Sequence, residues 1–255
     1  MAIRAVLFDL GNTLWHIPEP PPVEKIREET VRRISALLRS WSVEPEGELF
    51  FLGRDIRLAI EAADRRAYET HCVSPHFPTL VGEVAAAKGL DLTPEESEQL
   101  WQTWNLEGPF FGRRLFDDAI ETLEALRRQG YRLACVTNRV FGGPGFTQEV
   151  EEFGLDQLFD AMVVSCDVGY MKPHPKIFQH ALEGLGIEPQ EAVMVGDSLR
   201  ADVAGAQALG MATVWRRYPN VREQVDGVLP DYVVDALRQL LDLPPFRDGR
   251  QPGPR

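Results

Sequence analysis

Five side chains that can do chemistry lie shortly after apolar runs in this 255-residue sequence, namely Asp9, Thr137, Lys172, Asp197 and Asp202. Carboxylates are hard oxygen donors that suit Mg²⁺, which takes one or two of them together with water and substrate phosphate. Lys172 supplies a positive charge, and Thr137 can donate a hydrogen bond to a phosphoryl oxygen. A carboxylate beside a metal can also attack phosphorus and form an aspartyl-phosphate. If these groups meet in the fold, they are suited to phosphoryl transfer.

The elements that must bring these groups together are strands, which alternate with helices in the second half of the chain. Amphipathic stretches ending at glycine predict helices at 118–129, 149–153, 175–185 and 200–209. Short apolar runs predict strands at 3–8, 131–136, 161–165, 192–195, 212–215 and 232–234. This alternation is typical of βαβ units with a parallel sheet, whose carboxyl strand ends share one edge and hold the ligands.

The segment between the first strand and the rest of the sheet is helical in pattern. From Val23 to about Arg113 the apolar residues recur at helical spacing, and Thr93-Pro94-Glu95-Glu96 is a helix-start signal with a capping box. We therefore predict an α/β fold, a Rossmann-like three-layer core with a parallel sheet and an inserted all-helical domain. The predicted boundaries are 1–15 and 114–245 for the core, 16–113 for the insert and 246–255 for a loose tail.

Composition and charge exclude several classes of function. The formal charge is 27 − 39 = −12, which makes the chain a poor partner for nucleic acid. No apolar run is long enough for a membrane span, and no signal peptide is recognised. Three cysteines without a paired spacing fit a reduced, cytoplasmic setting. A small phosphorylated metabolite would need local positive charge in so acidic a protein. Monomer and homodimer both remain open.

Four segments of the sequence resemble the ordered motifs of the haloacid dehalogenase (HAD) superfamily of hydrolases. They are Phe8-Asp9-Leu10-Gly11-Asn12-Thr13-Leu14, Val136-Thr137-Asn138, Gly169-Tyr170-Met171-Lys172-Pro173-His174-Pro175-Lys176-Ile177-Phe178 and Val195-Gly196-Asp197-Ser198-Leu199-Arg200-Ala201-Asp202. The likeness covers the first strand and roughly residues 116–215, whereas the insert resembles the helical cap of the family only in position and pattern. The resemblance implies Mg²⁺-dependent hydrolysis of small phosphomonoesters through an aspartyl-phosphate.

The resemblance also assigns roles to particular residues. Asp9 is expected to be the nucleophile, Thr137 and Lys172 to hold the phosphoryl group, and Asp197 to bind Mg²⁺ with Asp202 close by. The carbonyl of Gly11 is a further expected metal ligand. Side chains that flank the first two motifs are expected to contact substrate or phosphate, namely Asn12, Thr13, Asn138 and Arg139.

One departure from the family pattern concerns the general acid. The usual first motif carries a second Asp two residues after the nucleophile, and this chain has Gly11 there. General acid–base assistance is typically worth about 10²–10⁴-fold in rate. His16, just beyond the turn, is a candidate replacement. Some sugar-phosphate phosphatases of the superfamily also carry Gly at this position.

Two other functions remain open on the sequence. A 2-haloacid dehalogenase would use Asp9 to displace halide without metal, and such enzymes also lack the second Asp. However, dehalogenases usually do not retain an acid at the position of Asp197. The third reading is a weakened phosphatase that binds a phosphorylated ligand without turning it over, as Gly11 would allow. The substrate itself is not readable from the motifs.

Overall fold

The structure is a computed structural model that describes residues 2–106, 108–218 and 225–247. Six parallel strands form one sheet in the order β5-β4-β1-β6-β7-β8. Their bounds are β1 Ala5–Phe8, β4 Arg132–Thr137, β5 Ala161–Val164, β6 Ala192–Gly196, β7 Ala212–Arg216 and β8 Tyr232–Val234. The first strand therefore belongs to a sheet whose other strands follow it by more than a hundred residues, as predicted, and the structure places it between β4 and β6.

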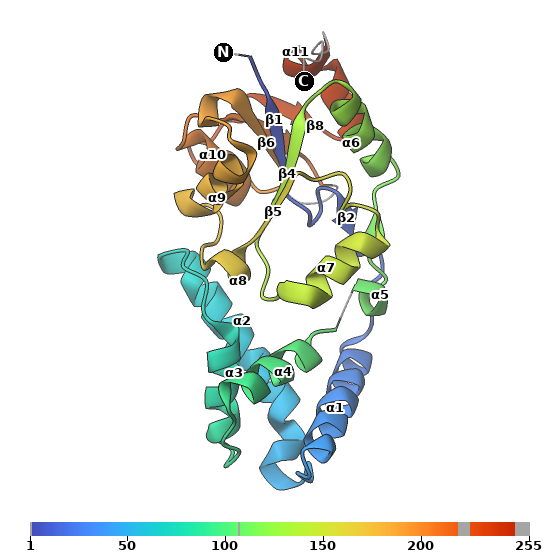
Figure 1. Cartoon of the computed structure of the whole chain (residues 1–255), viewed down its shortest axis with the longest axis vertical. Helices are drawn as coiled ribbons and strands as arrows, with labels where there is room; N and C mark the ends of the chain where they lie inside the picture. The colour runs from blue at the N-terminus through green and yellow to red at the C-terminus, as the bar shows by residue number, and fades with distance from the viewer. Residues whose placement is uncertain (1, 107, 219–224, 248–255) are drawn as a thin grey trace.

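Helices cover both faces of this sheet, as Figure 1 shows. The helical segments of the core are α6 Ala119–Arg128, α7 Gly143–Glu152, α8 Ser165–Val168, α9 Pro175–Leu185, η2 Pro189–Glu191, a π-helical turn η3 Leu199–Ala204, α10 Gly205–Gln207, η4 Leu237–Asp242 and α11 Pro244–Arg247. Successive residues of β1 enter two separate apolar clusters, Val6 and Phe8 in one and Ala5 and Leu7 in the other. This alternation confirms the predicted three-layer α/β fold.

The helical insert, residues 16–113, packs around an apolar cluster of its own, which includes Ile34, Ile56 and Trp101. Its helical segments are α1 Val23–Ser40, η1 Gly47–Phe51, α2 Leu52–Thr70, α3 Phe77–Ala86, α4 Pro94–Trp104 and α5 Gly108–Phe111. The capping box predicted at Thr93 and Glu96 is present at the start of α4. No described helix meets the length and hydropathy that crossing a bilayer requires.

A two-stranded antiparallel ribbon lies where the chain leaves the core and where it returns. It pairs β2, Trp15–His16, with β3, Arg114–Leu115. Two residues a strand leave no periodic pattern, so the sequence contained no signal for this ribbon. The division into two domains at this point remains our proposal.

Three local predictions need correction. The helix predicted at 149–153 begins at Gly143, because Pro144 is tolerated in the first turn of a helix. Ser165 opens α8 instead of ending a strand. Phe246, predicted to start the tail, is fully buried and its ring packs edge-on against Tyr131 with centroids 5.3 Å apart. Residues 248–255 of that predicted tail lie outside the described residues.

Candidate active site

The ends of three neighbouring strands place the first candidate residues side by side. Asp9 follows β1, Thr137 ends β4 and Asp197 follows β6, and β1 pairs with both of the other strands. The amide of Asp9 continues the sheet by donating to the carbonyl of Val195 at 2.9 Å. The three residues line a cavity of about 640 Å³. This edge is where parallel sheets bind their ligands, as expected from the sequence.

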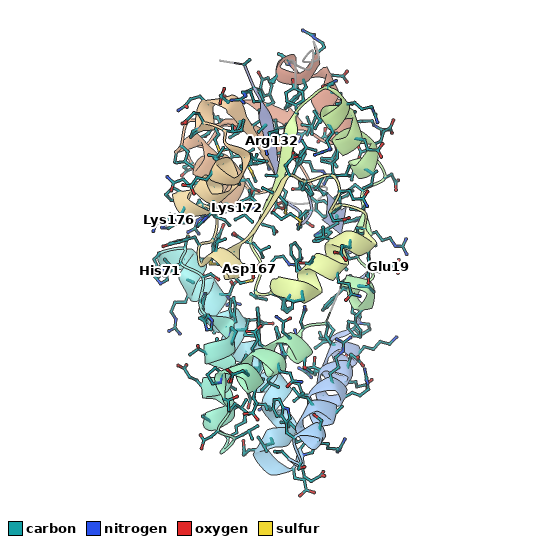
Figure 2. The ribbon with its side chains drawn as sticks, in the orientation of Figure 1. Glu19, His71, Arg132, Asp167, Lys172 and Lys176 are labelled. Carbon is teal, nitrogen blue, oxygen red and sulfur yellow. The ribbon has the colours of Figure 1, made fainter. Side chains whose placement is uncertain are left out.

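Lys172 lies in the α/β core (Figure 2), where it lines the cavity and is 2% exposed. Its Nζ lies 2.6 Å from Asp9 Oδ1 and 2.7 Å from Asp202 Oδ1. Although burial favours the neutral amine, the two carboxylates raise the pKa of Lys172 above its ordinary value. Lys172 is therefore a fixed cation that orients the Asp9 carboxylate and leaves the other oxygen of Asp9, Oδ2, free of this contact.

The three acids form a carboxylate cluster, defined here as Asp9, Asp197 and Asp202. One oxygen from each lies within 4.8 Å of the others. Burial and then the neighbouring carboxylates Asp9 and Asp202 raise the pKa of Asp197 to about 7. Burial also raises the pKa of Asp202 to about 6, against the attraction of Lys172. Crowded oxygen donors that take up protons so readily are a fitting donor set for a divalent cation such as Mg²⁺.

The turn after β1 is attached to the same cluster. Asn12 adopts a left-handed backbone conformation with φ of 52°, and its Nδ2 donates to Asp197 Oδ2 at 3.2 Å. Arg216, a nearly buried residue at the end of β7, donates from Nη1 to the carbonyl of Asn12 at 2.7 Å. The guanidinium carbon of Arg216 lies 3.7 Å from the ring centroid of Phe116. Sequence reasoning missed this support, since a single Arg after an apolar run carried no distinguishing pattern.

Of the residues predicted to contact substrate or phosphate, Thr13 lies outside the cavity wall, whereas Asn138 and Arg139 line the cavity and also contact other protein groups. Thr13 is fully buried and lies outside the cavity wall, so its side chain cannot meet a ligand there. Asn138 lines the cavity, but its amide donates to the carbonyl of Lys172 at 2.9 Å and accepts from the amide of Lys172 at 2.7 Å. Asn138 therefore positions the lysine. Arg139 also lines the cavity, and its guanidinium pairs with Glu149 at 3.1 Å.

Glu149 is at the centre of a two-arginine cluster, defined here as Glu149, Arg113 and Arg139. Both guanidinium groups contact its carboxylate, whose side chain is 4% exposed, and both lie over the indole of Trp15. Burial lowers the pKa of Arg113 to about 9 and that of Arg139 to about 10, so both stay charged at neutral pH. The cluster ties α7 to the β2–β3 ribbon beside the cavity. No sequence pattern indicated that Glu149 is buried.

Gly11 and His16 occupy the part of the cavity where the family pattern would place the general acid. A Cβ added at Gly11 would meet nothing closer than Asp9 Oδ2 at 4.0 Å, so the position has room for a side chain. The ring of His16 stacks on Phe116 with centroids 4.3 Å apart, and its Nδ1 lies 3.5 Å from the hydroxyl of Tyr218. His16 lines the cavity with Gly11.

Comparisons with known proteins all point to one family. A family model described as a haloacid dehalogenase-like hydrolase matches residues 3–210. The chain is 30% identical to a glyceraldehyde 3-phosphate phosphatase from Methanopyrus kandleri over 94% of this chain and 97% of that protein. It is 31% identical to a ribulose-1,5-bisphosphate 5-phosphatase from Halopiger xanaduensis over 94% and 98%.

Solved structures agree with this likeness. A HAD phosphatase from Thermococcus onnurineus superposes with a TM-score of 0.55 at 29% identity, covering 94% of this chain and 97% of that one. A 2-haloacid dehalogenase from Pseudomonas syringae pv. tomato superposes with a TM-score of 0.60 at 26% identity, with coverages of 94% and 97%. The match of the family model over most of the sequence, on a fold with its candidate residues gathered at one edge, shows that this chain belongs to the haloacid dehalogenase-like hydrolases.

Proposed function

We propose that this chain is a Mg²⁺-dependent phosphatase of small phosphomonoesters that works through a phosphoenzyme on Asp9. The observation that carries the proposal is the Asp9 carboxylate, held at one oxygen by Lys172 and flanked by two further acids in a cavity that opens to solvent. Phosphatase names among relatives that align over nearly the whole chain favour the same reaction. The cavity volume of about 640 Å³ is within the range typical of small-molecule sites.

The residues divide the work of the reaction between them. Asp9 Oδ2 forms a bond to phosphorus while the bond from phosphorus to the leaving oxygen breaks, and that oxygen takes up a proton. Water then attacks phosphorus, the bond to Asp9 breaks, and inorganic phosphate leaves with the Asp9 carboxylate regenerated. Lys172 and the hydroxyl of Thr137 stabilise the phosphoryl oxygens during both steps.

Mg²⁺ would be held by Asp9, the carbonyl of Gly11 and Asp197, with Asp202 beside it. When bound, it supplies positive charge that offsets the repulsion between an anionic nucleophile and an anionic substrate. The side chain of Asn12 positions Asp197, and Arg216 holds the turn through the carbonyl of Asn12. Asn138 fixes the backbone of Lys172.

The substrate proposed is a small phosphorylated metabolite bound between the core and the helical insert. Asp64 and Tyr68 of α2 line the same cavity as Asp9, so the insert provides part of the wall. The two relatives named above are phosphatases of sugar phosphates by name, and this class fits a cavity whose wall includes charged and polar side chains. Movement of the insert would admit substrate and exclude bulk water.

Halide displacement is the rival activity, because a dehalogenase structure is also similar to this chain. The carboxylate cluster argues against it. A 2-haloacid is itself an anion, and without a cation it would approach three carboxylates whose oxygens lie within 4.8 Å of one another. That arrangement favours a reaction that includes a divalent cation.

The test is hydrolysis of p-nitrophenyl phosphate by the wild type, Asp9→Asn and the control Asp156→Asn, an exposed acid outside the site. We expect turnover that needs Mg²⁺, is abolished by EDTA, falls at least about 10³-fold in Asp9→Asn, and is unchanged in Asp156→Asn. Turnover that persists in EDTA or in Asp9→Asn would refute the mechanism. If the wild type is inactive but Gly11→Asp gains activity, the chain is a phosphate-binding module. If the wild type releases halide from 2-haloacids in EDTA, the dehalogenase function holds.

A further inference from the structure

The leaving oxygen needs a proton, and Gly11 cannot supply it. We propose that Asp64, on helix α2 of the helical insert, is the general acid and base that this site otherwise lacks. The inference rests on the proposed phosphatase function and adds a catalytic residue to it. Asp64 is 55 residues from Asp9 in the sequence, and no family motif includes it.

The first support is where Asp64 lies. It lines the main cavity together with Asp9 and Gly11, and it also lines an adjoining chamber of about 240 Å³. The two spaces share Asp64, Arg113, Val140 and Phe141 as walls, so Asp64 is at their junction. The residues of α2 that line these spaces, at positions 57, 60, 61, 64 and 68, follow helical spacing. One face of α2 therefore spans the two spaces, with Asp64 near its middle.

The second support is that Asp64 has no structural partner that would explain its burial. Among the described residues, the carboxylate of Asp64 forms no hydrogen bond or ion pair. By contrast, each acid of the carboxylate cluster has a hydrogen-bond or ion-pair partner. Burial alone raises the pKa of Asp64 above its ordinary value, which favours the protonated form that a general acid needs. A half-buried acid without a partner in a ligand cavity is an expensive feature unless it acts on the ligand.

The charged and titratable groups that the structure describes around Asp64 leave its carboxyl without a partner and with a raised pKa. Arg57 and Glu61 of its own helix line the adjoining chamber, while Arg113, Arg139 and His16 line the main cavity with it. Arg113 and Arg139 already share the carboxylate of Glu149, and the guanidinium of Arg57 lies over Trp104 at 5.2 Å. Lys172 faces the cavity from the core, where it contacts two acids of the carboxylate cluster.

The alternative donor is His16, and its surroundings fit a structural role better. Its ring is stacked flat on Phe116, at an interplanar angle of 13°, and one nitrogen is within reach of Tyr218. Turning the imidazole towards a leaving group would break this stack. Asp64 has no such contact to lose.

The proposed chemistry balances over the two steps. In the first step the Asp64 carboxyl gives its proton to the leaving oxygen as the bond from phosphorus to that oxygen breaks, and the alcohol departs. In the second step the Asp64 carboxylate takes a proton from the water that attacks phosphorus, so the acid is restored. The sum is ester plus water to alcohol plus phosphate.

The test compares two substrates of similar shape that differ in their need for an acid. The leaving group of p-nitrophenyl phosphate is a weak base and departs unprotonated, whereas that of phenyl phosphate is a much stronger base. For Asp64→Asn we expect kcat on phenyl phosphate to fall about 10²-fold or more, and kcat on p-nitrophenyl phosphate to fall less than about 3-fold. The control Glu69→Gln changes an exposed acid on the same helix and should match the wild type on both.

Two further readouts separate catalysis from structure. With phenyl phosphate, the wild-type kcat should fall as pH rises past the pKa of Asp64, and this limb should vanish in Asp64→Asn. Introducing Gly11→Asp into Asp64→Asn should restore turnover of phenyl phosphate, because the open position at Gly11 accepts a side chain.

Equal losses on both substrates in Asp64→Asn, or no loss on either, would overturn the proposal. It would also fail if His16→Asn, and not Asp64→Asn, gave the selective loss on phenyl phosphate. A wild type that hydrolyses neither substrate with Mg²⁺ would instead refute the proposed function, and this inference with it. If the inference alone fails, the wild type still hydrolyses p-nitrophenyl phosphate in the presence of Mg²⁺.

Discussion

Replacing Glu149 by Gln should destabilise this protein strongly, although the residue lies outside every motif. Glu149 is the one acid of the two-arginine cluster, and the exposed fractions of the side chains are 4% for Glu149, 13% for Arg113 and 12% for Arg139. The Gln variant has the same shape but leaves two buried guanidinium groups without a counter-charge. Burial already lowers the pKa of both arginines, which shows how poorly this environment solvates a cation.

The magnitude follows from the burial of the cluster. Removing one partner of a buried ion pair typically costs about 3–5 kcal/mol, most of it from the charge that remains. For a chain of this size about 1 kcal/mol shifts the midpoint of thermal unfolding by roughly 2–4 °C. We therefore expect Glu149→Gln to lower Tm by about 6–20 °C, measured by circular dichroism at pH 7 in the presence of EDTA.

Two comparisons make this expectation strict. Glu152→Gln, at the exposed end of the same helix α7, should shift Tm by less than about 2 °C. Adding Arg113→Met to Glu149→Gln should recover part of the loss, because one uncompensated cation remains instead of two. A Tm for Glu149→Gln within about 2 °C of the wild type, or a double variant less stable than the single one, would refute the electrostatic account of this cluster.

Two further changes probe the carboxylate cluster. Because burial and its neighbours raise the pKa of Asp197 from 3.8 to about 7, the folded protein binds a proton that the unfolded chain has released, and stability falls as pH rises through that window. In EDTA at pH 8, the free energy of unfolding in urea should therefore be higher for Asp197→Asn than for the wild type, by roughly 1–4 kcal/mol at 1.36 kcal/mol per pKa unit. The gain should be much smaller at pH 5. An equal gain at both pH values would contradict this. Gly196→Ala would place Cβ 2.2 Å from the Asp202 carboxylate and should cost about 1–3 kcal/mol together with most phosphatase activity. Gly184→Ala, whose Cβ would meet Ala161 at an ordinary 3.5 Å, is the matched control for thermal unfolding and turnover.

The sheet and its ligand edge could be predicted because each strand is marked by local chemistry. Apolar runs of strand length end in polar residues at Asp9, Thr137 and Asp197, and helix ends are marked by glycine, as at Gly186 after α9. Gly186 has φ of 58°, a conformation that favours glycine. Such signals lie within a few residues of the element they define, so a single sequence contains them.

The partners of buried charges could not be predicted, because they are set by contacts between distant segments. Arg139 was expected to contact substrate or phosphate, and its contacts with Glu149 and Trp15 were not foreseen, because the periodicity of α7 does not reveal which acid faces inward. Asn138 was expected to contact substrate because it lies beside Thr137 in the sequence. Its hydrogen bonds to the backbone of Lys172, both shorter than 3 Å, join segments that are distant in the sequence and could not be predicted. A motif therefore locates a site more reliably than it assigns each side chain in it.

The charge of the site explains how so acidic a chain can receive an anionic substrate. The carboxylate cluster and Lys172 together carry 1 − 3 = −2 when fully ionised, and the ammonium of Lys172 already lies within 2.7 Å of two of these acids. Lys172 orients Asp9 and is placed to contact phosphoryl oxygens, but its single charge is already more than balanced by these acids, so it cannot by itself attract a phosphate dianion. A divalent cation would bring the same group of residues to neutrality. The raised pKa of Asp197 indicates that, without a cation, the folded site relieves part of this excess by binding a proton. Substrate binding should thus depend on prior cation binding, and the net charge of −12 of the chain does not conflict with a phosphorylated ligand.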